Sequence, residues 1–202
     1  MSKYFGTDGI RSKANTFPLD VDTVIKIGIA AGVVIKKDNH KHRVVIGKDT
    51  RLSGYMIESA LCAGFNSVGI DVFLVGPIAT PGISMLTRSM RCDLGVMVSA
   101  SHNPFYDNGI KFFDSKGLKF PDKIEAEIEK VLEEGDLSKY LVTDDKIGRA
   151  KRSDNNIYQQ RYTEFVKYMF PRDKNLNNFK IVLDCANGSN YKIAPMVLWE
   201  LG

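Results

Sequence analysis

The stretch that decides the fold is Leu94-Gly95-Val96-Met97-Val98, followed by Ser99-Ala100-Ser101-His102-Asn103-Pro104. Its first five residues are apolar and typical of a buried strand, and the polar residues after them predict a loop at the carboxyl end of that strand. Open α/β sheets bind their ligands at this end of their strands. We therefore expect a functional loop around Ser101, although a polar turn ended by Pro104 would have the same composition.

The side chains in and after this loop suit group transfer. Ser101 offers a nucleophile, His102 a proton carrier and Lys111 a positive charge, which together could perform phosphoryl or acyl transfer. A serine hydrolase is disfavoured because no Gly-x-Ser-x-Gly motif surrounds Ser101. Adjacent side chains such as Ser101 and His102 are also expected to diverge.

Helical and strand patterns alternate along the first two thirds of the chain. Helices are predicted at 20–36, 53–68, from about 81 and at 123–132, and strands at 44–46, 72–75, 94–98 and 110–113. This alternation, with continuous apolar strands, predicts βαβ crossovers. The expected fold class is α/β: a three-layer αβα domain with a mixed, mostly parallel sheet, followed by the start of a second, similar αβα domain.

The chain is expected to divide into residues 1–135, a linker at 136–156 with little periodicity, and a partial second domain at 157–202. The last part contains a predicted helix at 157–169, a strand at 181–183 and a helix from about 191. One strand and two helices cannot close a core of their own. We therefore expect an exposed apolar patch there, which favours self-association.

Composition excludes several classes of partner. With 44% hydrophobic residues and a net charge of +4, the chain is typical of a globular protein and too weakly basic to indicate a nucleic-acid partner. The amino terminus has no apolar signal core and no apolar run of about 18 residues occurs, so no membrane partner is expected. Cys62, Cys92 and Cys185 are odd in number and widely separated, which favours reduced thiols and a cytoplasmic location.

One basic cluster lies between the first predicted helix and strand. It consists of Lys36, Lys37, Lys41 and Arg43, with His40 and His42 among them. Its place in the sequence favours a solvated turn. We do not expect a metal site from the two histidines alone, because neither a carboxylate nor a cysteine lies at ligand spacing.

Three further loops could hold an anion. The segment 47–54 brings Lys48 and Arg51 to the amino end of a predicted helix, where they are candidate substrate-binding residues. A capped turn in which Arg51 pairs with Asp49 is the alternative. The segment 5–11 carries two glycines and Arg11, which can grip phosphate with two bonds. The segment 184–189 is interpreted, from spacing alone, as a connection that caps the next helix.

In this order, the loops resemble those of the α-D-phosphohexomutase family. The matching segments are Tyr4–Arg11, Gly47–Gly54, Ser99–Asn103, Phe105–Phe113, Arg161–Pro171, Asp184–Gly188 and Ile193–Pro195. The stretch SHNPFYDNGIKFF, residues 101–113, resembles the glucosamine branch more than the phosphoglucomutase or phosphomannomutase branches. The resemblance covers essentially the whole chain.

The resemblance implies a phosphosugar mutase that interconverts glucosamine 6-phosphate and glucosamine 1-phosphate through a bisphosphate intermediate, for amino-sugar nucleotide and cell-wall synthesis. Ser101 matches the phosphorylated serine, Lys111 a proton carrier or charge stabiliser, Arg11 a phosphate-gripping arginine and His102 a histidine near the sugar hydroxyl. In the family, Mg²⁺ binds one oxygen of the phosphoserine, here Ser101, and three aspartates of a second-domain loop.

Two alternatives remain: a glucose or mannose phosphate as substrate, and a non-catalytic fragment that binds phosphosugars. The sequence reaches Gly202 before the family's aspartate loop, its sugar-reading loop and its last phosphate-binding loop. Because phosphoryl transfer depends on positioning and charge stabilisation, we expect this chain alone to be inactive.

Overall fold

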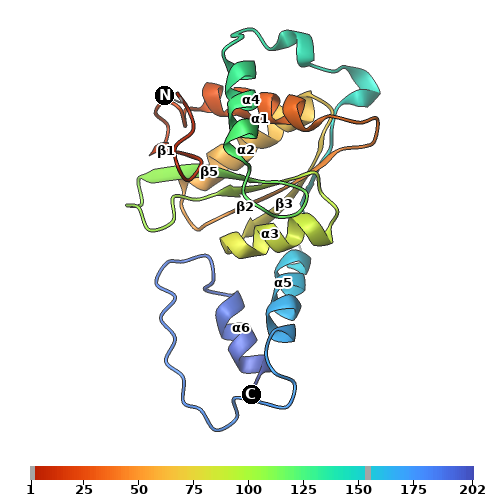
Figure 1. Cartoon of the computed structure of the whole chain (residues 1–202). Helices are drawn as coiled ribbons and strands as arrows, with labels where there is room; N and C mark the ends of the chain where they lie inside the picture. The colour runs from red at the N-terminus through yellow and green to blue at the C-terminus, as the bar shows by residue number, and fades with distance from the viewer. Residues whose placement is uncertain (1–2, 153–155) are drawn as a thin grey trace.

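A six-stranded sheet forms the centre of the computed structural model, which describes residues 3–152 and 156–202 (Figure 1). Its strands are β1 (Ile10–Lys13), β2 (Arg43–Lys48), β3 (Asp71–Pro77), β4 (Leu94–Val98), β5 (Asp107–Phe113) and β6 (Ala150–Arg152). The order is β1-β5-β4-β2-β3-β6, and only β5 runs antiparallel to its neighbours. The expected mixed, mostly parallel sheet is confirmed.

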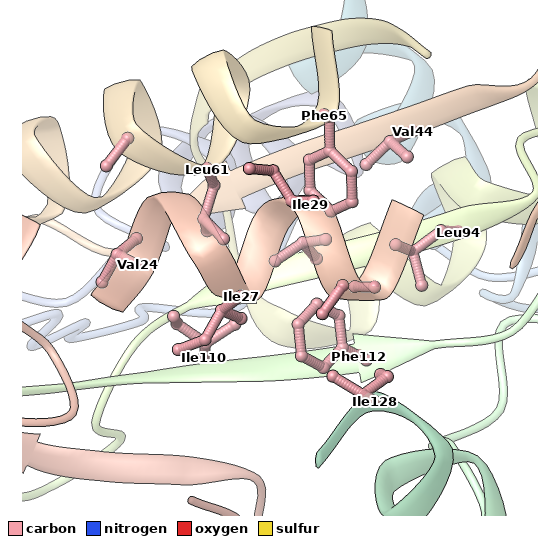
Figure 2. Close-up of a cluster of buried hydrophobic side chains, with 14 of the residues drawn as sticks. Val24, Ile27, Ile29, Val44, Leu61, Phe65, Leu94, Ile110, Phe112 and Ile128 are labelled. Carbon is pink, nitrogen blue, oxygen red and sulfur yellow. The ribbon is translucent and has the colours of Figure 1, made fainter. Parts of the chain in front are cut away.

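Helices cover both faces of the sheet. On one face lie α1 (Val21–Ile35), α2 (Ser53–Ser67) and α4 (Asp122–Leu132), and on the other lies α3 (Thr80–Ser89) (Figure 1). Figure 2 shows how Leu61 and Phe65 of α2 and Ile27 of α1 pack toward Phe112 of β5 in the larger core. The alternation of strand and helix therefore produces the three layers predicted from the sequence.

The paired helices α1 and α2 approach each other closely through two glycines. A Cβ atom on Gly28 would lie 2.9 Å from the carbonyl oxygen of Leu61, and one on Gly64 would lie 2.4 Å from that of Ile25. Asp20 fixes the start of α1, because its carboxylate accepts a 3.0 Å hydrogen bond from the backbone N–H of Thr23. The two glycines allow the helices to pack closely, and the Asp20 cap begins α1 at the position predicted from the sequence.

The segment expected to be a linker contributes to the sheet. Within 136–156 the structure has short 3-10 helices at Ser138–Tyr140 and Asp144–Lys146, and then β6, which pairs in parallel with β3. Three residues, Ala150–Arg152, were too few to give a strand pattern in the sequence. The described part of the linker therefore extends one edge of the sheet.

The carboxyl-terminal part consists of α5 (Ile157–Tyr168) and α6 (Ile193–Glu200), joined by a long irregular segment. Both helices agree with the prediction, but the strand predicted at 181–183 is wrong. Val182 is 93% exposed, and the structure pairs these residues with no other described strand. An apolar run becomes a strand only where a neighbour can complete its hydrogen bonds. Trp199 is also 81% exposed, so apolar surface is open here as expected.

The helices were compared with the length and apolar character of a membrane-spanning helix. Among the helices formed by the described residues, none combines the length and the apolar character needed to cross a bilayer.

Candidate active site

The Ser101 loop leaves the sheet at the carboxyl end of β4, as predicted. Ser101 is exposed and has a φ of 58°, a left-handed conformation that residues other than glycine seldom adopt. Ser99 supports it: the Ser99 hydroxyl accepts a 3.0 Å hydrogen bond from the backbone N–H of Ser101 and donates one of 2.7 Å to Asp49. The Ser101 hydroxyl is thus presented to solvent on a backbone that neighbouring side chains hold in a strained form.

Arg51 holds this loop from the facing segment 47–54. Its guanidinium donates to the backbone carbonyls of Ser101 (2.9 Å), Asn103 (3.0 Å), Pro104 (2.7 Å) and Asp107 (3.3 Å). Its Nε donates to the Asp49 carboxylate at 2.9 Å. One planar group therefore ties together four carbonyls of the loop that presents Ser101.

These two segments line a cleft of about 900 Å³. Ser101, His102 and Arg51 lie on one side of it, and Asn187 and Gly188 of the carboxyl-terminal part lie on another. The Thr50 hydroxyl also donates a hydrogen bond to the carbonyl of Asn187. The segment 184–189, which spacing alone suggested was only a connection, thus contributes to the wall of the cleft.

Lys48 and Arg51, the two residues expected to bind substrate, both have partners within the chain. The Lys48 side chain is only 1% exposed, its ammonium pairs with Glu58, and it lies 3.7 Å from the centroid of the Tyr55 ring. Its positive charge is already neutralised in the interior. Arg51 lines the cleft, and its guanidinium donors bond the Ser101 loop and Asp49.

His102 lies beside the proposed nucleophile. Its Nδ1 is 3.4 Å from the Ser101 hydroxyl oxygen, so the expectation that these adjacent side chains diverge is wrong. The distance is long for a hydrogen bond, but both groups line the same cleft.

Arg11 and Lys111 lie on the two neighbouring strands β1 and β5. Arg11 pairs with Gly109 in the sheet, and Lys111 follows two residues later on β5, so both side chains belong to the same face. Arg11 lines a separate pocket of about 440 Å³ formed by the amino-terminal loop. One guanidinium nitrogen bonds Asp8 at 2.8 Å, while its buried Nε has no hydrogen-bond partner among the described residues.

The surroundings of Lys111 make its ammonium group more acidic than that of an exposed lysine. Burial lowers the pKa of Lys111 below its usual 10.5, and the positive charge of Arg11 lowers it further. An ammonium with a lowered pKa gives up its proton more readily than an exposed lysine does. The structure thus places an unpaired arginine nitrogen and a lysine of lowered pKa together on one face of the sheet.

Two residues of the site had no functional role in the sequence interpretation. Asp49 was considered only as a partner of Arg51, and Ser99 only as the start of the loop. In the structure Asp49 links Arg51 to Ser99, and Ser99 bonds the backbone of Ser101. Their positions in the sequence could have identified them as site residues, because each immediately follows one of two neighbouring parallel strands, and ligands bind at the carboxyl ends of such strands.

Comparison with known proteins agrees with this geometry. The model of phosphoglucomutase/phosphomannomutase, alpha/beta/alpha domain I, matches residues 2–139. The chain belongs to this family. The family resemblance and fold class inferred from the sequence are therefore confirmed, and the Ser101 loop and the segments 5–11 and 47–54 all lie within the matched domain I.

Two curated relatives match nearly the whole length of this chain. The chain is 58% identical over 200 residues to a phosphoglucosamine mutase of Rhizobium etli and 59% identical over 201 residues to one of Allorhizobium ampelinum. Each match covers 99% of this chain but only 44% of the relative. A solved structure of a putative phosphomannomutase from Thermus thermophilus has a TM-score of 0.79 at 26% identity, covering 98% of this chain and 43% of that one.

Proposed function

We propose that this chain supplies the phosphoserine part of a phosphosugar mutase that interconverts glucosamine 6-phosphate and glucosamine 1-phosphate. The observation that carries the proposal is the exposed Ser101 hydroxyl, held on a strained backbone in a cleft at the carboxyl end of β4. The name phosphoglucosamine mutase, borne by relatives 58% and 59% identical to the chain, supports this choice of substrate.

The proposed reaction moves one phosphoryl group in each of two steps. A sugar hydroxyl attacks the phosphorus of phosphorylated Ser101, so that an O–P bond to the sugar forms as the Oγ–P bond breaks, giving a bisphosphate. The Ser101 oxygen then takes the other phosphoryl group of that bisphosphate, which frees the second sugar oxygen. Such transfers depend on positioning and charge stabilisation, and the Arg51 contacts supply positioning by fixing the loop.

Charge and proton movement are assigned to three other residues. Lys111, whose pKa is lowered, receives the proton of the attacking hydroxyl and returns it to the sugar oxygen freed in the second step, or stabilises the transferring group. Arg11 grips a phosphate, and its buried unpaired Nε supports that role because a phosphate oxygen would satisfy it. His102 lies 3.4 Å from the Ser101 oxygen, close enough to orient a hydroxyl in the cleft.

The residues of the cleft can supply one ligand to a magnesium ion, an oxygen of phosphorylated Ser101. Asp49 is the only carboxylate among the described residues that line the cleft, and Arg51 and Ser99 already donate to its oxygens. When bound, Mg²⁺ would neutralise charge on the transferring phosphoryl group. We propose that its remaining protein ligands lie outside the described residues of this chain.

We further propose that residues 1–135 form the phosphoserine domain and 157–202 the opening of a second domain, and that the reaction takes place in the cytoplasm. The chain spans less than half the length of the relatives, and residues 186–189 of its carboxyl-terminal part line the cleft beside the Ser101 loop. The three cysteines are unpaired, which supports a reducing compartment. The purified chain alone is expected to form no glucosamine 1-phosphate.

Two measurements test the proposal. The first incubates a full-length enzyme that contains this sequence with glucosamine 1,6-bisphosphate and looks by intact mass for a single phosphoryl group, mapped to Ser101 by fragmentation. The second assays a full-length enzyme that contains this sequence with the 6-phosphates of glucosamine, glucose and mannose. Turnover of glucose or mannose phosphate alone would favour the phosphoglucomutase/phosphomannomutase alternative, and an unmodified, inactive Ser101 in both would favour a non-catalytic fragment that binds phosphosugars.

A further inference from the structure

A second cluster of reactive side chains lies at the amino ends of the strands, whereas Ser101 lies at their carboxyl ends. His40 and His42 precede β2, and Asp93 immediately precedes β4, its neighbour in the sheet. One ligand atom of each residue lies within 4.8 Å of those of the other two. No carboxylate lies at ligand spacing from the two histidines in the sequence. The pairing of β2 with β4 brings the carboxylate of Asp93 to them.

Backbone geometry fixes the arrangement. The rings of His40 and His42, two residues apart in the chain, stack with their centroids 4.0 Å apart. Asp93 Oδ1 is 2.8 Å from His40 Nε2, while Asp93 Oδ2 accepts a 2.8 Å hydrogen bond from the backbone N–H of Arg43. The strand pairing thus holds the carboxylate by one oxygen and leaves the other facing the imidazoles.

From this geometry we propose that His40, His42 and Asp93 bind one divalent transition-metal ion, with Zn²⁺ the best match. Two imidazole nitrogens and one carboxylate oxygen form a donor set typical of zinc, in which water takes the fourth tetrahedral position. The hydrogen bond from Arg43 to Asp93 is the kind of outer contact that orients a metal ligand. The ion replaces the short contact between His40 and Asp93.

The surroundings are compatible with such a site. Lys36 directs its ammonium to the carbonyl of Val68 at 3.0 Å, and Lys41 lies 3.4 Å from Asp71. Both lysines still weaken the attraction for a cation, so moderate affinity is expected.

A metal here would join the segment between α1 and β2 to the start of β4, far from the proposed phosphoryl chemistry. Its consequence is therefore stability rather than catalysis. An ion that binds only the folded chain raises the free energy of unfolding in proportion to the logarithm of its concentration. The inference does not depend on the mutase proposal, and its measurements require no turnover.

Calorimetric titration of the chelator-treated chain with ZnCl₂, and the visible spectrum with CoCl₂, test the site. We expect one bound ion per chain and a higher melting temperature in the presence of Zn²⁺. His40→Ala, at an exposed position, should weaken binding by at least about tenfold, because loss of a ligand costs no less than loss of an outer contact. Asp93→Asn should weaken it as well.

The matched control is His102→Ala, which removes the third histidine of the chain from the other end of the sheet. It should bind Zn²⁺ with unchanged stoichiometry and affinity. Circular dichroism confirms that each variant is folded before titration. Absence of binding to the unaltered chain, or binding that His40→Ala and Asp93→Asn leave intact, would overturn the proposal, including the case in which a cysteine holds the ion instead.

Discussion

Replacing Arg51 tests whether one guanidinium holds the Ser101 loop in place. Of its four bonds to loop carbonyls, those to Asn103 and Asp107 are partly shielded from solvent, whereas those to Ser101 and Pro104 can be replaced by water. Counting only the two shielded bonds, at about 1.5 kcal/mol each for a charged donor, Arg51→Ala should make local opening of the loop easier by about 3 kcal/mol.

Hydrogen exchange measures this effect directly. The backbone N–H of Asp107, which bonds the carbonyl of Pro104 at 3.0 Å, should exchange about a hundredfold faster in the Arg51→Ala variant. Arg51→Lys keeps the charge but lacks the planar fork, so it should recover little of the protection. Arg88→Ala, at an exposed position in the last turn of α3, is the matched control and should leave exchange in the loop unchanged.

In a full-length enzyme that contains this sequence, the same variants separate positioning from substrate binding. If Arg51 positions the loop, Arg51→Ala lowers kcat and leaves KM nearly unchanged, and Arg51→Lys does little better. Unchanged exchange at Asp107 in Arg51→Ala, or recovery of both exchange and kcat by lysine, would refute this reasoning. A rise in KM alone would restore the substrate-binding role first expected from the sequence.

Three further results are expected from the interior and the surface. Glu58→Ala leaves the buried ammonium of Lys48 without its counter-charge and should lower the free energy of unfolding by about 3–5 kcal/mol in urea titrations; a loss below about 1 kcal/mol would show that the pair contributes little. Burial, with a smaller contribution from the charge of a neighbouring aspartate, raises the pKa of Cys92 from 9.0 to about 12. The thiol of the unfolded chain therefore ionises first, and the free energy of unfolding falls as pH rises between these values. Cys92→Ala should reduce this dependence of the free energy of unfolding on pH, and an equal dependence in both proteins would disprove it. Val182→Lys should reduce self-association measured by light scattering, whereas a chain that is monomeric at every concentration would contradict the expected association.

The order of elements from α1 to α4 was predictable because each carries a strong local pattern, whereas β1 (Ile10–Lys13), which pairs with the distant β5, was not predicted. The buried run Leu94–Val98 and the capped helix after Asp20 need no distant partner to be recognised. The strand predicted at 181–183 failed for the opposite reason. Its residues are apolar enough for a strand, but hydrogen-bonding partners come from elsewhere in a fold, and local sequence does not contain them.

The candidate site was predictable in part. Position at the end of a strand identified Ser101 and its loop, but residue type alone suggested that Lys48 and Arg51 would both face a ligand. Whether a cation is exposed depends on partners distant in sequence, such as the carbonyl of Asp107, 56 residues after Arg51. The same limit applies to Asp93, which lies 53 residues from His40 in sequence and 2.8 Å from it in the structure.

The central claim is that the Ser101 oxygen carries the phosphoryl group, and the mass and activity of a Ser101→Ala variant test it most directly. In a full-length enzyme that contains this sequence, Ser101→Ala should abolish both the phosphorylated species seen by intact mass and the formation of glucosamine 1-phosphate. Ser59→Ala, at an exposed position on α2, should retain both. If Ser101→Ala still becomes phosphorylated or still interconverts the two sugar phosphates at the unaltered rate, Ser101 does not carry the phosphoryl group.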